Sequence, residues 1–227
     1  RENRDADGRA VTFDHQIGKI YANLTIGADL PAAVSLVSNS TLAFRGVQLI
    51  GSGFIVTRET AIALGLETVP EADRHIRDYR HGRDLTASPR GVMVIDLFGL
   101  SESEVKSRFP LIYQHVLDHV QPDRDSNNRA SYKKNWWIFG EPRRDMRPAL
   151  AGLSTYIATV ETSKHRFFTQ LSGEVLPDNM LVAFGLTETS SMAILSGRFH
   201  VMWALGQGAI LGPTPRYNKS RCFDTFP

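Results

Sequence analysis

Cations, amide side chains and flat aromatic rings lie close together in one stretch of the sequence, residues 121–147. Lysine and arginine side chains bind phosphates, while arginine forks and asparagine amides pair with base edges. After Arg129 the stretch holds only two acids, Glu141 and Asp145. It therefore predicts contact with nucleic acid, and double-stranded DNA is the expected partner. The candidate contact residues are Asn127, Asn128, Arg129, Lys133, Lys134, Trp136, Arg143, Arg144 and Arg147.

The adjacent tryptophans of this stretch, Trp136 and Trp137, have a second interpretation. Adjacent tryptophans are commonly anchors of a core, because each buries a large apolar area and needs one partner for its indole N–H. In that case Trp136 packs beneath the loop instead of wedging into DNA. The arginines could likewise form a solvated face. The sequence leaves these alternatives open.

Further candidate contacts lie outside this stretch. Four arginines recur at spacings of three, Arg74, Arg77, Arg80 and Arg83, and on a helix they would share one face. That face either grips phosphates, chiefly through Arg80 and Arg83, or is a solvated surface neutralised by neighbouring aspartates. The remaining candidates are Lys164 and Arg166 at a predicted bend, and Asn218 and Lys219 in the C-terminal tail, with Asn218 placed for an adenine edge.

The motifs of common catalytic sites are missing from the sequence. It has no G-x-S-x-G nucleophile elbow, no phosphate-binding P-loop and no dense carboxylate cluster for Mg²⁺. No two prolines are adjacent, so the Asn-Pro-Pro-Tyr element with which amino-methyltransferases hold an extruded base is absent. The glycines of Gly51–Gly53 are followed by a predicted strand, which favours a turn over a nucleotide loop. We therefore expect recognition without a catalytic residue.

A pair of histidines, His115 and His119, is the one candidate for a metal site. At a spacing of four they would share a helix face and could ligate zinc. The zinc-peptidase motif needs a glutamate where this sequence has Val116, and the inverted motif needs one where it has Asp118. We expect a solvated face and no metal, and keep a small metal-dependent hydrolase as the third hypothesis.

Length and composition set the outer bounds. The chain has 227 residues, a net charge of +2 and 42% hydrophobic residues, which is ordinary for a soluble domain. Residues 129–166 nevertheless hold eight basic and three acidic side chains. The single cysteine, Cys222, excludes an internal disulfide and fits a reducing cytosol. No signal peptide or membrane-spanning run is found. Because the chain begins without methionine, we expect a piece of a longer protein.

These residues must be positioned by predicted strands and helices. Strands are expected at 10–15 and 17–26, in a hairpin over 44–57, and at 91–100, 155–163 and 179–187. Helices are expected from Thr57, over 101–122 with a break at Pro110, and over 190–206 with a cap at Ser190. Ser101 and Glu104 match a capping box. Two apolar stripes are expected to face the core, Val105, Phe109, Ile112, Val116 and Val120 in one helix, and Met192, Leu195, Phe199, Met202 and Leu205 in the other.

Strands and helices alternate without a regular βαβ rhythm. This pattern predicts an α+β fold with a mostly antiparallel or mixed sheet and three to four helices.

Several segments resemble a known family. Residues 75–85, HIRDYRHGRDL, resemble an element of the specificity domains of adenine-specific DNA methyltransferases. Residues 129–143, residues 176–204 and above all the tail RYNKSRCFDTFP, residues 216–227, are similar to the region after the catalytic domain in the MmeI-like class of restriction-modification enzymes. The resemblance runs from Ala10 to Pro227, and the order of the motifs makes it specific.

The resemblance implies a target recognition domain that chooses the DNA sequence. Its parent enzyme would transfer a methyl group from S-adenosylmethionine to N6 of adenine, and no cofactor is expected in this fragment. The expected partners are double-stranded DNA and the parent's methyltransferase domain, without a membrane, in the cytoplasm of a bacterium. The implied division is 1–25 as a linker, 26–188 as the recognition domain, and 189–227 as a C-terminal helix and tail.

A different class of function stays open beside this one. The chain could be a protein-interaction module that docks the methyltransferase onto a partner subunit. In that case the tryptophan pair and the neighbouring Phe167 and Phe168 would form an exposed apolar hot spot.

Overall fold

The computed structural model describes residues 3–4, 7–11, 17–18, 20 and 30–227. The chain divides into two compact units, Arg1–Ala33 and Val34–Pro227. In the first unit, β1 (Asn3–Arg4) pairs antiparallel with β2 (Ala10–Val11), and η1 (Leu30–Ala32) is a 3-10 turn. The strands predicted at 10–15 and 17–26 lie largely outside the described residues. The division predicted at residues 25 and 188 stays a prediction.

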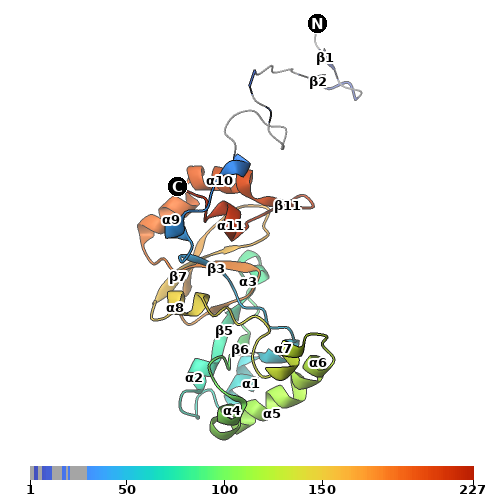
Figure 1. Cartoon of the computed structure of the whole chain (residues 1–227), viewed down its shortest axis with the longest axis vertical. Helices are drawn as coiled ribbons and strands as arrows, with labels where there is room; N and C mark the ends of the chain where they lie inside the picture. The colour runs from blue at the N-terminus through green and yellow to red at the C-terminus, as the bar shows by residue number, and fades with distance from the viewer. Residues whose placement is uncertain (1–2, 5–6, 12–16, 19, 21–29) are drawn as a thin grey trace. The chain divides into compact units, whose positions relative to one another are not determined.

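The unit Val34–Pro227 is built on two four-stranded sheets (Figure 1). The first sheet is antiparallel, in the order β3 (Ala43–Arg45), β10 (Leu181–Phe184), β7 (Thr155–Val160) and β8 (Thr169–Ser172). The second is mixed, in the order β4 (Ile55–Val56), β6 (Met93–Ile95), β5 (Ile76–Arg80) and β9 (Leu176–Pro177), with β5 and β9 parallel. The predicted α+β class with antiparallel and mixed sheet is confirmed.

Helices surround both sheets, and most are short. The described residues hold eleven α-helices, more than the three or four predicted, and six of them have only four or five residues. They are α1 (Arg58–Ala63), α2 (Ala72–His75), α3 (Gly82–Thr86), α4 (Glu102–Arg108), α5 (Pro110–His119), α6 (Gln121–Asp125), α7 (Ala130–Lys134), α8 (Met146–Leu150), α9 (Thr189–Ser196), α10 (Arg198–Gln207) and α11 (Lys219–Cys222). Within the described residues, every helix is too short or too polar to cross a membrane.

The second sheet and the α4–α5 pair follow the sequence closely. All three residues of β6 are buried, as its apolar run predicts. Ser101 and Glu104 form the predicted capping box, and Pro110 starts a new helix after α4. The predicted stripe from Val105 to Val120 is buried in full against this sheet. The apolar face of the two helices therefore accounts for this half of the core.

The two central strands of the first sheet, β10 and β7, are buried on both faces. One face packs against α9, α10 and the C-terminal tail, through a core that includes Phe184, Tyr217 and Phe223. The other face carries Tyr156 and Ala158, which pack with the partly buried Leu150, Leu153 and Leu171. Every residue of β10 is buried. A strand buried on both faces has a nearly continuous apolar sequence, and this run predicted β10.

The hairpin predicted over residues 44–57 is not formed. β3 and β4 belong to different sheets, and η3 (Ser52–Phe54) is a 3-10 turn between them. A side chain at Gly53 would lie within 2.3 Å of the carbonyl oxygen of His119. Gly53 therefore permits a close packing of backbones where the chain passes from one sheet to the other.

The predicted face of four arginines is also wrong, because residues 76–80 form a strand. Pairing of β5 with β6 and β9 overrides the helical spacing, and buries Ile76 and Tyr79. Gly82 begins α3 instead of ending a helix, with His81 and Asp84 as a capping box. The arginines consequently lie on three different elements.

The helix predicted over 190–206 is two helices, separated by the extended backbone of Gly197. The break rotates the second helix, so that His200 and Ala204 face the core. Phe199 and Met202, predicted as core residues, are 90% and 60% exposed. Glu188 takes the N-cap position predicted for Ser190.

A buried histidine makes the stability of this half dependent on pH. The Nε2 atom of His200 lies 3.1 Å from the Tyr217 hydroxyl, and its ring stacks on Phe226 with centroids 4.6 Å apart. Burial, with the charge of Arg166 as the smaller cause, lowers the pKa of His200 to about 4. The unfolded chain, with its histidine pKa near 6.5, therefore binds more protons than the folded chain between these two pH values.

We predict that the contribution of His200 to the free energy of unfolding is complete above pH 6.5. As the pH drops toward 4, the free energy of unfolding should fall by roughly 3 kcal/mol. Urea unfolding at about pH 7.5 and about pH 4.5 measures this loss. His200→Phe keeps a ring against Phe226 but binds no proton, so its loss between the two pH values should be smaller. Equal losses in the two proteins would show that His200 does not carry the effect.

Candidate nucleic-acid interface

The basic stretch begins on α6 with an arginine that is fully buried. The Nη2 atom of Arg124 donates to the carbonyl oxygens of Leu49 and Ile138, at 2.8 and 2.9 Å. Its guanidinium lies over the rings of Phe54 and Tyr132. Burial lowers the pKa of the Arg124 guanidinium. This side chain therefore holds the stretch against the core and is unavailable to a phosphate.

Tyr132, buried on α7, links the two halves of the stretch. Its hydroxyl accepts from Nη1 of Arg129 at 2.7 Å and lies 3.3 Å from Oε1 of Glu141. Lys133 and Lys134, beside it on the same helix, are exposed and make no ion pair within the described part of the chain. The helix thus places one side chain in the core and two cations in solvent.

The two tryptophans lie beneath this loop. Trp136 is 6% exposed and packs edge-on against Tyr113, with ring centroids 5.8 Å apart. Trp137 donates its indole N–H to the carbonyl oxygen of Leu100 at 3.0 Å. Of the alternatives left open by the sequence, burial is therefore the one observed.

The second half of the stretch runs back toward β3. The backbones of Gln48 and Glu141 pair as an antiparallel bridge, with both N–H···O distances at 3.0 Å. Arg143 then takes a left-handed backbone conformation, φ +55°, and its Nε atom donates to the carbonyl oxygen of Gly46 at 3.1 Å. This pairing brings Arg143 to the edge of the first sheet.

Two adjoining hollows, of about 210 and 590 Å³, lie along β3 and share Phe44, Asp145 and Lys219. We call their lining the β3 groove. It presents three cations and one acid, and is lined by Ser40, Thr41, Ala43, Phe44, Arg45, Arg143, Asp145, Met146, Pro148, Ala149 and Lys219. Lys219 is partly engaged, since its Nζ atom lies 3.1 Å from Asp224 and donates to the carbonyl oxygen of Ser40 at 3.2 Å.

A single buried carboxylate continues this row of cations. Oε2 of Glu161 accepts from Arg45 at 2.8 Å, and Oε1 accepts from Nε and Nη2 of Arg216 at 2.9 and 2.6 Å. Both arginine side chains stay more than a third exposed, whereas that of Glu161 is 8% exposed. The two guanidinium groups are thus held side by side with part of each facing solvent.

Lys164 and His165, at the predicted bend after β7, are exposed. With Thr86, Thr162, Ser163, Phe167 and Thr214 they line a hollow of about 560 Å³. We call it the bend hollow. No carboxylate is among the side chains that line it.

Two of the predicted DNA contacts point inward instead. Nη1 of Arg166 donates to the Thr159 hydroxyl at 2.9 Å and to the carbonyl oxygen of Val160, and burial lowers its pKa. Arg147 forms a bidentate ion pair with Asp96, at 2.7 and 2.9 Å. Both guanidinium groups are satisfied by the protein, so they position neighbouring segments.

The other predicted contact residues differ in their solvent exposure and in whether they already make hydrogen bonds within the protein. Arg83, Asn128 and Arg144 are exposed. The half-buried Arg80 donates to the carbonyl oxygen of Tyr79 at 3.0 Å. Two amide oxygens serve the local backbone: that of Asn127 accepts from the Arg129 N–H, and that of Asn218 caps α11.

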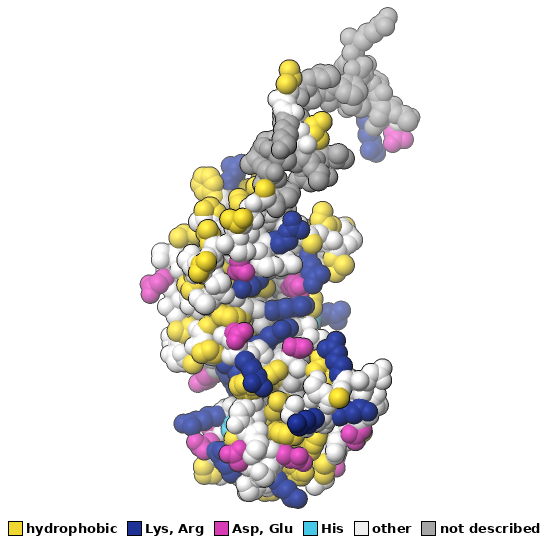
Figure 2. Space-filling view, in the orientation of Figure 1, with side chains coloured by type: hydrophobic (Ala, Val, Ile, Leu, Met, Phe, Trp, Pro, Cys, Tyr) yellow, Lys and Arg dark blue, Asp and Glu magenta, His cyan; other side chains and the backbone are white. Residues whose placement is uncertain are grey.

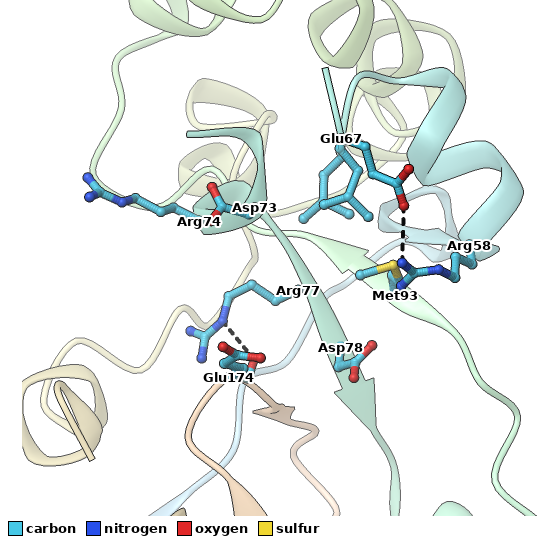
Figure 3. Close-up of a pocket in the computed structure, with 10 residues that line it drawn as sticks. Arg58, Glu67, Asp73, Arg74, Arg77, Asp78, Met93 and Glu174 are labelled. Atoms are coloured by element: carbon cyan, nitrogen blue, oxygen red, sulfur yellow. Dashed lines mark hydrogen bonds and ion pairs between the residues drawn. The ribbon is translucent and has the colours of Figure 1, made fainter. Parts of the chain in front are cut away.

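The arginines around β5 face a further hollow, of about 540 Å³ (Figure 3). Arg77 donates to the carbonyl oxygens of Gly173 and Glu174, and burial lowers its pKa. Arg58 pairs with Glu67 at 3.2 Å, and two further carboxylates, Asp73 and Asp78, line the same hollow. Because acids balance the cations here, this hollow suits a phosphate less well than the β3 groove does.

Sequence reasoning missed Arg45 in the β3 groove and left Arg216 out of the candidate site. Arg45 follows two apolar residues of a strand, and its partner Glu161 lies 116 positions away. No local pattern signals such a pair. Figure 2 shows the outcome: Lys and Arg side chains run down one face over both sheets, with carboxylates among them.

The histidine pair and the predicted apolar hot spot both belong to the protein's own packing. His115 Nε2 lies 3.0 Å from the carbonyl oxygen of Gly53, and its ring stacks on His119. Within the described residues no cluster of three or more His, Cys, Asp or Glu is placed to hold a metal. Trp136 and Phe168 are buried, so the hot spot expected for protein docking is not exposed at these residues.

Comparison with known proteins bears on the fold of this chain. No family model matches the chain, and no curated protein sequence matches it. Among solved structures, the chain is similar to part of the Type IIL restriction-modification enzyme MmeI, solved in complex with DNA. The TM-score is 0.65 at 17% sequence identity, over 87% of this chain and 26% of that one. The two share a fold, and this chain spans about a quarter of MmeI.

The bridge made by Glu161 gives a prediction about stability. Glu161→Gln removes the charge that holds Arg45 and Arg216 and leaves donors unpaired, so we expect a loss of about 2 kcal/mol in the free energy of unfolding. Glu67→Gln, which breaks the exposed pair with Arg58, is the matched control and should change it by less than about 0.5 kcal/mol. Denaturant unfolding of the three proteins measures both values, and similar losses in the two variants would contradict the assignment.

Proposed function

We propose that the unit Val34–Pro227 binds double-stranded DNA and selects its sequence, as the recognition part of a restriction-modification methyltransferase. The observation that carries this proposal is the likeness of its fold to a segment of MmeI, an enzyme whose structure was solved with DNA. The row of half-exposed cations along β3 is independent support, because a phosphate backbone needs such a row.

The β3 groove is the proposed phosphate site. Arg45 and Arg143 line it with Lys219, and Arg216 adjoins it through Glu161. Hydrogen bonds to Glu161 and to the carbonyl oxygen of Gly46 fix three of these side chains before DNA arrives. Contacts made by side chains that are already ordered lose less conformational entropy on binding.

Exposed side chains outside the groove are proposed to extend the contact. Lys133 and Lys134 on α7 would meet phosphates, with Arg80, Arg83, Arg129 and Lys164 as further backbone contacts. Asn128 and Arg144 are the proposed base readers, because both are exposed and carry the donors that major-groove edges pair with. Asn127 and Asn218 keep only their amide N–H groups for a base. No DNA contact is proposed for three buried or inward-pointing side chains, Arg147, Arg166 and Trp136. Their proposed role is to position the segments that carry the contact residues.

The chemistry of the proposed parent enzyme lies outside this chain. A methyltransferase domain would supply S-adenosylmethionine and the pocket for an extruded adenine. Residues 26–188 would then form the recognition domain, residues 189–227 its C-terminal helix and tail, and residues 1–25 the link to the catalytic part. No catalytic role is proposed for any residue of this chain.

Protein docking remains the alternative, on a different surface from the one predicted. The α9–α10 pair exposes Ile194, Phe199, Met202 and Leu205. Patches of exposed apolar side chains commonly mark contacts with other proteins. This role is compatible with DNA binding by the β3 groove, so a DNA-binding assay tests the recognition role, and failure to bind DNA would leave docking as the remaining function.

The direct test is selection of bound duplexes from a random-sequence pool. A recognition domain should enrich one short sequence, whereas a docking module should enrich none. For the sequence so found, binding measured over about 50 to 200 mM salt should weaken steeply as counterions are released.

We predict that Lys133→Ala/Lys134→Ala weakens binding to all duplexes by a similar factor. The slope of log affinity against log salt should become shallower by about two, because two phosphate contacts are lost. Fluorescence anisotropy with labelled duplexes measures both quantities. Lys106→Ala on α4 is the control and should leave the slope unchanged. An unchanged slope in the double variant would remove α7 from the interface.

A further inference from the structure

An exposed β-hairpin follows α10. β11 (Ala209–Leu211) and β12 (Thr214–Arg216) pair antiparallel around the two-residue turn Gly212–Pro213. Gly212 has a φ of +59°, at the position where type II′ turns place glycine. Near its tip the hairpin carries Ile210 and Leu211, which are 76% and 59% exposed. Water thus surrounds two large apolar side chains on a ribbon of only two strands.

The base of this hairpin is fixed to the first sheet. The backbone of Thr162 bridges to Arg216, the Ser163 N–H donates to the carbonyl oxygen of Pro215, and the Tyr217 N–H donates to that of Glu161 at 2.6 Å. At the other strand, a side chain on Gly208 would meet the carbonyl oxygen of Arg216 at 2.6 Å. The hairpin therefore projects from a rigid root at the end of β7.

Cations flank the hairpin on two sides. Thr214 of β12 lines the bend hollow together with the exposed Lys164 and His165. Arg216, at the base of β12, shares Glu161 with Arg45 of the β3 groove. The hairpin thus adjoins two groups of cations that suit phosphates, one through Thr214 and one through Arg216, and the carboxylate of Glu161 is buried and already occupied.

This arrangement matches duplex DNA better than it matches another strand or a protein core. Apolar wedges of isoleucine, leucine or proline enter a groove and press between base steps, while cations on either side hold the phosphates. A protein partner that covered Ile210 and Leu211 would have no need of the cations. At β12, addition of a further strand is hindered by Pro215, which lacks an N–H to donate, and by the pairing of Arg216 with Thr162.

We propose that the β11–β12 hairpin is a DNA wedge: Ile210 and Leu211 enter a groove of the duplex and partly unstack a base step, while Lys164 and Arg216 hold the flanking phosphates. This inference rests on the proposed function and adds to it an apolar contact that the cations alone do not provide. Apolar burial is insensitive to counterions, so its effect on binding separates from that of the lysines.

The test is the variant Ile210→Ser/Leu211→Ser, measured against random-sequence duplexes of about 30 base pairs that carry 2-aminopurine, whose fluorescence rises on unstacking. The variant should bind about tenfold more weakly with the salt slope of the wild type. It should also lose the rise in 2-aminopurine fluorescence that wild-type protein causes. Both side chains are exposed, and an unchanged melting temperature will show that the variant is folded.

The matched control is Phe199→Ser/Met202→Ser, which removes two equally exposed apolar side chains from α10. It should bind and unstack DNA as the wild type does. If the hairpin variant binds DNA with wild-type affinity and causes the same rise in fluorescence, the wedge proposal is wrong, whereas the proposed function is unaffected. A weaker affinity with a shallower salt slope, or a loss of self-association without any effect on DNA, would also overturn it. If wild-type protein binds no duplex, the proposed function falls and the wedge with it.

Discussion

The buried carboxylate of Glu161 ties together segments that are far apart in the chain. Its two oxygens hold Arg45 of β3 and Arg216 of β12. Its backbone donates to the carbonyl oxygen of Met180 and accepts from the Tyr217 N–H, both within 2.7 Å. The edge of the first sheet, the root of the hairpin and the C-terminal tail therefore share one anchor. A charge buried at this depth is tolerated because each oxygen has a guanidinium partner, and the same pairing keeps two cations fixed and half-exposed.

Several arginines among the described residues are structural, which changes what the basic composition means. Arg124, Arg147 and Arg166 are held by contacts with carbonyl oxygens, a carboxylate or aromatic rings. Such guanidinium groups order the loops and strand ends from below, because a planar fork can bond several backbone segments at once. Fewer lysine and arginine side chains are therefore available to bind a partner than the sequence alone suggests. Those along β3, at the bend after β7 and on α7 are proposed to contact DNA.

The proposed recognition of DNA draws on two kinds of contact that respond differently to conditions. Fixed cations along the β3 groove supply an electrostatic contact that salt weakens. The hairpin supplies apolar area that salt hardly affects, and its rigid root limits the entropy lost on binding. The exposed apolar side chains of α9 and α10 belong to neither of these contacts. It leaves room for a protein neighbour, such as the rest of a longer enzyme, without competing for DNA.

The sequence by itself predicted the features that depend on local interactions. The caps at Thr57 and Ser101, the helix break at Pro110 and the buried strands β6, β7 and β10 all follow from residues within a few positions of one another. Only the tertiary structure decided the strand at residues 76–80, the rotation of α10 and which cations face solvent. The physical reason is distance along the chain: Asp96 lies 51 positions from Arg147, and Glu161 lies 116 from Arg45. The sequence alone gives no sign that a side chain has a partner so far along the chain. Only the tertiary structure shows that the side chain is already in an ion pair.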